Sequence, residues 1–323
     1  MDTCWNSKIP IQRKCPLMTK HREAILCMLV AALFFCLTEV CMKKINGDLN
    51  GVQVNATRYT LAGLALMPWS RKQLLARHAR VTFAQQKLCF FLGFMGIAMV
   101  GPLYQMASVV LGASHTAVIF SSTPLFITVL AALILGTPIT RYEIAALGLQ
   151  VLAIAVLVDP FHMTLDPGGF LGLMVCVFGY SLYAVGGKKL MPALGSVTVT
   201  AWTFLWGGLQ LLFVAFLSHI PAVAAFFTAH GLGNYAYIPL LTGYTWANLP
   251  WVLTLYLGIT LVAFLCWFRA MEVGSITLGS LTYFIKPALS PLFAWFFVGE
   301  AITFQMALGM GLMLLGARIA LIK

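Results

Sequence analysis

Charged residues are scarce in this chain of 323 residues, because Asp, Glu, Lys and Arg together make up only 9% of it. An average soluble domain carries roughly 25%. So few charges cannot cover the surface of a soluble globule, and the composition therefore excludes that class. Acidic residues are the scarcest, at nine against twenty basic ones. On a soluble chain the resulting net charge of +11 would suggest nucleic-acid binding.

Patterned cysteines are also missing. Eight cysteines occur, but none forms a C-x-x-C pair, and most lie inside apolar runs. We expect buried hydrophobic residues rather than a disulfide framework or a metal site. A Walker motif is absent as well, so the chain is not expected to hydrolyse ATP. We predict no metal, no cofactor and no enzymatic activity.

Apolar runs are abundant, since 61% of the residues are hydrophobic. A membrane span needs about 20 apolar residues, so ten spans would use about 200 of them. We predict an all-α integral membrane protein with ten transmembrane helices. The predicted spans are 24–42, 50–69, 88–107, 115–135, 142–159, 169–187, 196–217, 250–269, 275–298 and 301–321.

The segments between the spans are short, with one exception. Pro and Gly interrupt the apolar stretch near 218–249, which predicts a long external loop with a short interfacial helix near 221–229. Residues 160–168 form the predicted connecting loop. Residues 1–23 form the predicted N-terminal tail, and the basic lead-in after Met18 makes this residue the expected natural start.

Basic residues fall almost entirely on one side of this map. If the spans alternate in direction, sixteen of the twenty share that side, and only Lys43 and Lys44 lie on the other. The positive-inside rule then places both termini in the cytoplasm and predicts a multi-pass protein of the plasma (bacterial inner) membrane, not a nucleic-acid binder. The sixteen are Lys8, Arg13, Lys14, Lys20, Arg22, Arg71, Lys72, Arg77, Arg80, Lys87, Arg141, Lys188, Lys189, Arg269, Arg318 and Lys323.

The two halves of the chain share a register of Gly, Pro and boundary residues. We predict a first repeat at 24–159 and a second at 169–321, each with five spans. Because five is odd, the second repeat enters from the opposite side, which makes an inverted repeat. At an offset of 163 the matches include Ala107/Ala270, Pro124/Pro287, Gly136/Gly299 and Gly148/Gly311. At an offset of 145 they include Val52/Val197, Gly63/Gly208 and Leu64/Leu209.

The end of the second half carries a family resemblance. The run 283–291 (YFIKPALSP) leads to Gly299-Glu300 at a short turn, followed by a Gly-spaced final helix with Gly309 and Gly316. With these features the chain resembles a transporter of the EamA type in the drug/metabolite transporter superfamily. The first half departs from this pattern, because Gly136-Thr137-Pro138 lacks the Glu. The resemblance implies a ten-helix fold that opens inward and outward, and export of small metabolites.

Lys286 lies near the middle of the ninth predicted span, where a charge costs about 2.5–3.5 kcal/mol on insertion scales. It must therefore face a cavity or a partner. Pro287 follows it and frees the carbonyl of Tyr283. The pattern indicates either a contact for an anionic group, such as a carboxylate, or a structural ion pair inside the bundle.

Arg58 and Glu39 are the other charges at membrane depth. Arg58 lies eight residues into the second span, about 12 Å deep at 1.5 Å per residue. Glu39 lies near the outer end of the first span. Three arrangements stay open: Glu39 pairs with Arg58, pairs with Lys286, or titrates alone as a proton-coupling group whose pKa burial would raise.

Several aromatic residues within spans are candidates for the lining of a solute cavity, although each could instead be a packing residue. They are Tyr180, Tyr183, Trp202, Trp267 and Tyr283. Pro124, Pro287 and Pro291 are candidate kinks for gating. Gly residues in spans five and ten predict close helix packing, either in a scaffold or in a homodimer contact.

Together these features favour a secondary active transporter that exports a small metabolite (an amino acid, an organic acid or a related solute) by alternating access, with proton coupling as an option. Its expected partners are the solute and the lipid bilayer. The alternatives are an intramembrane enzyme and a channel-like facilitator. Gly112-Ala113-Ser114-His115 resembles a serine intramembrane protease motif, but His replaces the second Gly.

Overall fold

The computed structural model describes residues 17–45, 47–111, 116, 119–158, 166–299 and 302–321, and the regular elements in these ranges are helical. Five helical runs are long and apolar enough to cross a membrane. These runs are Lys20–Ile45, Phe83–Ala107, Pro167–Leu194, Ser196–Leu217 and Leu249–Val273. The chain is thus a helical protein that passes through the membrane several times.

Helix is present in each of the ten predicted ranges. In the first half the elements are α1 (Leu17–Cys36), α2 (Thr38–Ile45), α3 (Gly51–Ala76), α4 (Phe83–Gly93), the π-helix η1 (Phe94–Ala98), α5 (Val100–Leu111), α7 (Thr123–Leu135) and α8 (Arg141–Val158). In the second half they are α9 (Pro167–Leu194), α10 (Ser196–Leu217), α11 (Pro221–Ala229), the 3₁₀ turn η2 (Gly233–Tyr235), α12 (Leu249–Leu253), the π-helix η3 (Thr254–Ala263), α13 (Phe264–Val273), α14 (Ile276–Ser280), α15 (Thr282–Val298) and α16 (Phe304–Leu321).

The repeat found in the sequence is visible in the helix boundaries. α3 and α10 begin at positions related by the offset of 145, and α8 and α16 begin and end at positions related by the offset of 163. The π-helix η1 likewise maps inside η3. Gly136 and Gly299 follow equivalent helices and both adopt positive φ, at 67° and 77°, a conformation that favours glycine.

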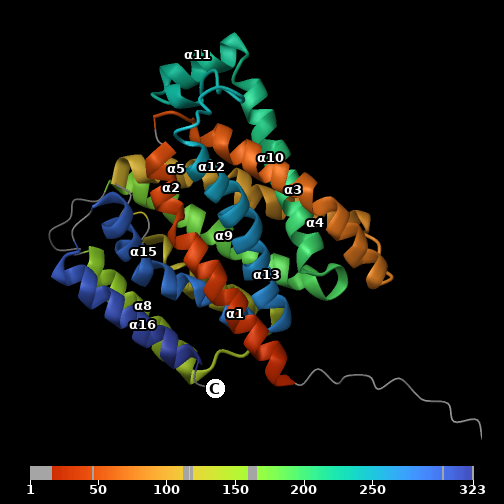
Figure 1. Cartoon of the computed structure of the whole chain (residues 1–323), viewed down its shortest axis with the longest axis vertical. Helices are drawn as coiled ribbons and strands as arrows, with labels where there is room; N and C mark the ends of the chain where they lie inside the picture. Colours follow the sequence, from red (N-terminus) through yellow and green to blue (C-terminus); the bar gives the residue numbers. More distant parts are fainter. Residues whose placement is uncertain are drawn as a thin grey trace, which may run out of the picture.

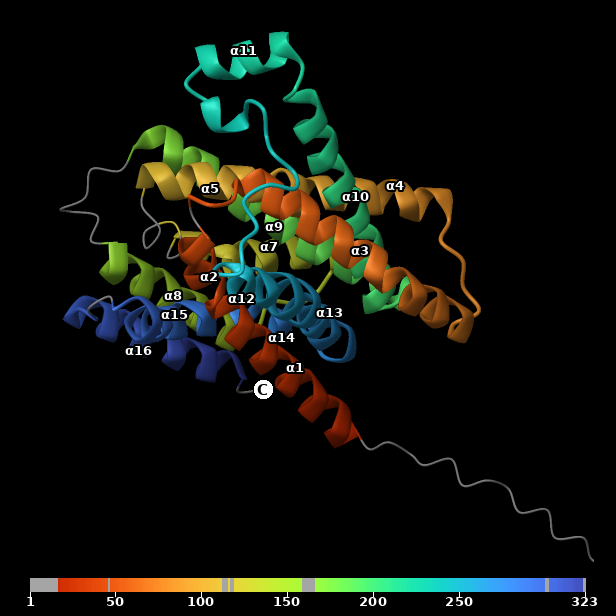
Figure 2. The ribbon, with the colours of Figure 1, turned by 45° about the horizontal axis from the view of Figure 1, so that its top comes forward.

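Equivalent helices of the two repeats pack against each other. α3 packs along α10, and α8 packs along α16, as Figures 1 and 2 show from two directions. One large apolar core joins the two halves between these pairs. Because each pair combines the same helix from both repeats, the architecture is a two-repeat bundle whose halves meet along matched helices.

Three helices run past the ends of their apolar sequences. α3 continues through Arg71 and Lys72, α9 contains Lys188 and Lys189, and α13 contains Arg269. We expected loops directly after the predicted span ends at 69, 187 and 269, but α3, α9 and α13 continue to Ala76, Leu194 and Val273. An apolar run shows which part of a helix lies inside the membrane, but it does not show where the helix ends. Arg, Lys, Gln and Leu are all good helix formers, so the helix continues beyond the apolar run.

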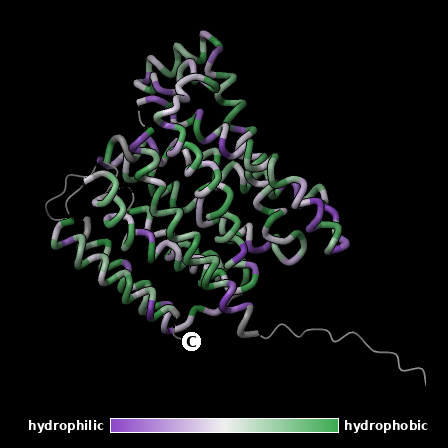
Figure 3. Tube along the Cα trace, in the orientation of Figure 1, coloured by the Kyte–Doolittle hydropathy of each residue, from purple (hydrophilic) through white to green (hydrophobic). Residues whose placement is uncertain are grey.

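The bundle has two distinct ends. The start of α1 and the end of α16 lie at one of them, which we name the termini end, and α11 projects from the other, the loop end (Figures 1 and 2). Most of the helices are largely hydrophobic in Figure 3, and hydrophilic residues gather at the turn between α3 and α4. The predicted 160–168 loop falls largely outside the described residues, and α9 begins within it at Pro167.

Candidate functional site

Ten aromatic side chains from both repeats meet in the middle of the bundle, and each of them is buried. We call this group the aromatic cluster. Its members come from α1, α3, the turn before α7, α9, α10, α13 and α15. They are Phe35, Tyr59, Phe120, Tyr180, Tyr183, Phe204, Phe264, Trp267, Phe268 and Tyr283.

Trp267 lies at the centre of the aromatic cluster. Its ring stacks on Tyr180 with centroids 5.4 Å apart and meets the ring of Tyr283 edge-on at 5.9 Å. The indole Nε1 donates a 3.0 Å hydrogen bond to the carbonyl of Gly279, which ties α13 to α14. Phe264, Trp267 and Phe268 follow i, i+3, i+4 spacing, so one face of α13 turns toward the cluster.

The hydroxyls of Tyr180 and Tyr283 link α9 to α15, the helix that carries Lys286. Tyr283 donates a 2.7 Å hydrogen bond to Tyr180. Lys286 follows Tyr283 by about one turn on α15 and is only 9% exposed. Its backbone carbonyl accepts a 3.5 Å hydrogen bond from Cys36 Sγ at the end of α1. Lys286 is therefore held where α15 passes the break between α1 and α2.

Arg58 occupies the loop-end side of the aromatic cluster and is 8% exposed. Its Nη2 donates a 3.1 Å hydrogen bond to the hydroxyl of Tyr59, and its Cζ lies 4.5 Å from the centroid of that ring. The guanidinium also interacts electrostatically with the hydroxyls of Tyr180 and Tyr256. Arg58 thus lies between the cluster and the loop end.

At the loop end, side chains of the segment 218–249 bond to the first repeat. The hydroxyls of Thr57, Tyr244 and Tyr256 form a hydroxyl triad, with Thr57 2.6 Å from Tyr256 and Tyr244 2.9 Å from Tyr256. Nearby, Gln53 Nε2 donates a 2.7 Å hydrogen bond to the carbonyl of Thr242. These contacts tie the long segment to the start of α3.

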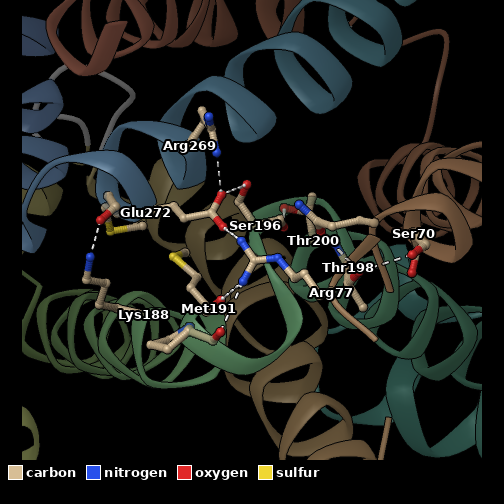
Figure 4. Close-up of polar contacts among 12 residues, drawn as sticks. Ser70, Arg77, Lys188, Met191, Ser196, Thr198, Thr200, Arg269 and Glu272 are labelled. Carbon is tan, nitrogen blue, oxygen red and sulfur yellow. Dashed lines mark hydrogen bonds and ion pairs between the residues drawn. The ribbon is translucent and has the colours of Figure 1, made fainter. Parts of the chain in front are cut away.

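At the termini end, a polar network centred on Glu272 joins the two repeats (Figure 4). Its carboxylate binds Arg77 of α3 and, at 3.0 Å, Arg269 Nη1, and it accepts a 2.5 Å hydrogen bond from Ser196 Oγ. Arg269 Nε also pairs with Glu23 of α1 at 2.8 Å. We call these contacts the Glu272 network.

Basic side chains in and near the Glu272 network also donate hydrogen bonds to backbone carbonyls. Arg77 Nη1 donates to the carbonyls of Met191 at 3.2 Å and Pro192 at 3.0 Å. Lys188 Nζ donates to the carbonyl of Met271. Helices α1, α3, α9, α10 and α13 therefore converge at this end, and the network links them.

Replacing Glu272 by Gln should weaken this network. The side chain of Glu272 is 9% exposed, whereas those of Arg77 and Arg269 are 32% and 41% exposed. Losing one partner of a fully buried ion pair costs about 3–5 kcal/mol. Because solvent reaches the two arginines and screens their charges, we expect a smaller loss of unfolding free energy here, about 1–3 kcal/mol. Thermal unfolding of the purified variant measures this loss.

The same variant should open the termini end more often. A cysteine introduced at Thr200, which is buried below the network, should react with maleimide faster when Glu272 is Gln. Asp166→Asn is the matched control, because it removes one negative charge while Asn caps α9 as well as Asp. Equal labelling rates in the Glu272 variant and the control would contradict a gating role.

Four of the predicted aromatic residues, Tyr180, Tyr183, Trp267 and Tyr283, are brought together in the aromatic cluster. Trp202 is not, because it is half-buried on α10 and makes no ring contact with them. Pro124 is buried at the start of α7. Pro287 and Pro291 lie within α15. The side chains of Glu39 and Pro287 and the run 112–115 are outside the described residues.

Sequence reasoning missed Phe35, Tyr59, Phe120, Phe204, Phe264 and Phe268. The α-helical spacing of Phe264 with Trp267 was a usable signal. The Glu272 network and the hydroxyl triad were also missed, because their members are far apart in sequence. Among the described residues, no group of three or more His, Cys, Asp or Glu side chains is placed to hold a metal ion.

Comparison with known proteins agrees with this architecture. The model of the EamA-like transporter family matches residues 22–159 and again 167–322. An uncharacterized transporter of Clostridium kluyveri is 22% identical over 92% of both chains. Protein PecM of Dickeya dadantii is 24% identical over 66% of both chains. A solved crystal structure shares the fold with a TM-score of 0.68, at 18% identity over 93% of this chain and 96% of its own. The chain belongs to the EamA-like transporter family, within the drug/metabolite transporter superfamily.

Proposed function

We propose that this transporter is a secondary active carrier that exports a small metabolite by alternating access. The observation that carries the proposal is the aromatic cluster, which both repeats build together and which is closed by polar contacts at each end. A carrier needs a site between two halves and a separate closure on either side of it. A channel would need a continuous path, and an enzyme would need a reactive group at the centre.

The two closures provide the moving parts of the proposed mechanism. Breaking the Glu272 network would open the termini end, and breaking the hydroxyl triad would open the loop end. Each closure consists of a few hydrogen bonds and ion pairs between the repeats, contacts that two rocking halves can exchange. The solute would bind among Lys286, Arg58 and the aromatic cluster while one closure is open.

Orientation and location follow from the distribution of charge. The Glu272 network brings Arg77 and Arg269 together at the termini end, where the ends of α1 and α16 also lie. We propose that this end faces the cytoplasm of a plasma membrane (bacterial inner membrane), because basic residues concentrate on the inner side. The segment 218–249 would then face outward.

The homodimer option concerns α8 and α16. These helices pack against each other within one chain and leave Ile144, Val151 and Leu315 exposed on their outer surface. That surface faces lipid or a second copy. Chemical crosslinking in native membranes distinguishes the two, because only a dimer gives a product of twice the mass.

Transport by the purified protein tests the proposal directly. A thermal-shift screen against amino acids, organic acids and amines identifies a solute that stabilises the protein. Counterflow of that solute, radiolabelled, into proteoliposomes then measures carrier exchange, in which internal unlabelled solute accelerates uptake. Flux that does not respond to internal solute would contradict a carrier and favour a channel-like facilitator.

Glu39→Gln tests proton coupling. If Glu39 carries the coupled proton, the Gln variant should exchange solute normally in counterflow but lose its response to an imposed pH gradient. A carboxyl group in an apolar site is suited to this role because burial favours its protonated form. Asp48→Asn, at the loop that follows α2, is the matched control. A pH response equal to that of the wild type would leave Glu39 as a structural residue.

A further inference from the structure

Arg58 is a buried cation whose hydrogen-bonding capacity is mostly unused. The side chain is 8% exposed, and its Nε and Nη1 are buried without a hydrogen-bond partner. In the part of the chain that the structure describes, the guanidinium forms no ion pair with a carboxylate. Only Nη2 is bonded, to the hydroxyl of Tyr59. A buried charge is costly unless it is paired, so this arrangement requires an explanation.

The surroundings of Arg58 indicate what would complete it. Its Cζ lies 4.5 Å from the ring centroid of Tyr59, and its charge acts on the hydroxyl of Tyr180; both tyrosines belong to the aromatic cluster. The charge also acts on the hydroxyl of Tyr256, a member of the hydroxyl triad. The site therefore offers one positive charge, donors and acceptors from hydroxyls, and an apolar aromatic surface.

We propose that Arg58 binds the carboxylate of a small organic monocarboxylic acid whose apolar body packs against the aromatic cluster. Guanidinium N–H groups match a carboxylate better than any other side chain does. The unused Nε and Nη1 supply the donors, and the aromatic rings accept an apolar or aromatic body. This inference rests on the proposed carrier function and names its class of solute.

The hydroxyl triad gives this site an outer gate. Tyr244 belongs to the segment 218–249, and its hydroxyl lies 2.9 Å from that of Tyr256 and 3.2 Å from that of Thr57. Thr57 precedes Arg58 on α3, and the charge of Arg58 acts on the hydroxyl of Tyr256 in the triad. A solute bound at Arg58 would be released outward once Tyr244 leaves the triad.

Binding by the full-length protein in lipid nanodiscs tests the site. The probes are benzoate and hexanoate, with benzamide and hexanamide as neutral counterparts of the same shape and benzylamine as a cation. We expect the two carboxylates to raise Tm by about 2–4 °C at saturation and the amides and the amine to leave it unchanged. A shift of equal size with the amides would overturn the proposal.

Variants at Arg58 assign the effect to this residue. Arg58→Gln should abolish the shift and weaken carboxylate binding at least tenfold, and Arg58→Lys should retain part of it. Arg71→Gln is the matched control, because Arg71 is exposed on the same helix and undergoes the same change of charge. A carboxylate-induced shift that survives in Arg58→Gln would overturn the proposal.

The ligand-free protein supplies a second, independent readout. If Arg58 awaits an anion, Arg58→Gln removes an uncompensated buried charge and should leave the Tm of the ligand-free protein equal or higher. If Arg58 instead serves the fold, that Tm falls and the proposal fails. Counterflow separates this proposal from the carrier function. Carboxylates that bind through Arg58 but are not exchanged would refute the carrier function alone, and exchange of other solutes without carboxylate binding would refute the site alone.

Discussion

Lys286→Ala should strongly reduce transport while the protein still folds. A hydrogen bond to a charged group is worth about 1.5–3 kcal/mol, and each 1.4 kcal/mol is a factor of ten. Loss of an ammonium contact to the solute therefore predicts a fall in transport kcat/KM of about 10- to 100-fold. Counterflow in proteoliposomes measures this fall. The helix is expected to persist, because Ala is the best helix former and the change removes a charge from membrane depth.

Two further variants define what Lys286 contributes. Lys286→Arg keeps the charge and should retain part of the transport, whereas Lys286→Met keeps the length and should fail as Ala does. Lys189→Ala is the control, since Lys189 is exposed on α9 and loses the same group. Normal counterflow in Lys286→Ala would show that Lys286 does not contact the solute. Lys286 would then have a structural role, as part of an ion pair inside the bundle.

Much of the fold was accessible from the sequence, because the membrane imposes a simple pattern. The apolar runs located helix in all ten predicted ranges, and the offsets of 145 and 163 recur in the boundaries of α3, α8, α10 and α16. Gly136 and Gly299 matched because a left-handed residue follows the same helix in both repeats. Helix ends were harder to place. Hydropathy shows which residues suit the membrane interior, and it does not show where the backbone hydrogen bonds of a helix end. Arg71, Lys188 and Arg269 are charged and still lie within helices.

The candidate site was only partly accessible. Tyr180, Tyr183, Trp267 and Tyr283 stood out as aromatic residues within spans, and they meet in one cluster. Trp202 had the same signal, but it is half-buried against the apolar core and has no described ring contact with them. The sequence of an apolar helix does not show which of its faces turns toward the cluster. The pairing of Arg77 with Glu272 joins residues from different repeats. No local pattern predicts such a contact.

Gly208→Ala should strongly destabilise the protein, because it separates α3 from α10. A Cβ at Gly208 would lie 2.5 Å from the backbone nitrogen of Thr60 and 2.4 Å from its Oγ1. At the equivalent Gly63 it would lie 2.6 Å from the backbone nitrogen of Leu205. Backbone atoms cannot rotate away as a side chain can. Overpacking typically costs about 1–3 kcal/mol, and we expect about 3 kcal/mol at either position.

The two substitutions should not be additive. Once α3 and α10 have moved apart to accept one methyl group, the second finds the space already open. Gly63→Ala together with Gly208→Ala should therefore cost clearly less than the sum of the single changes. Unfolding free energies from denaturant titration of all three variants measure this coupling.

Gly148→Ala is the control for both positions. Gly148 lies inside α8, and no described atom beyond the backbone of that helix is within 4 Å of a Cβ placed there. Alanine should be neutral at this position or stabilise by up to about 1 kcal/mol, the difference in helix propensity. Full additivity at Gly63 and Gly208, or a loss at Gly148 as large as theirs, would show that the close approach of α3 and α10 does not set the cost. The expected contrast would instead establish that the two repeats are locked together at the pair of glycines that the repeat itself relates.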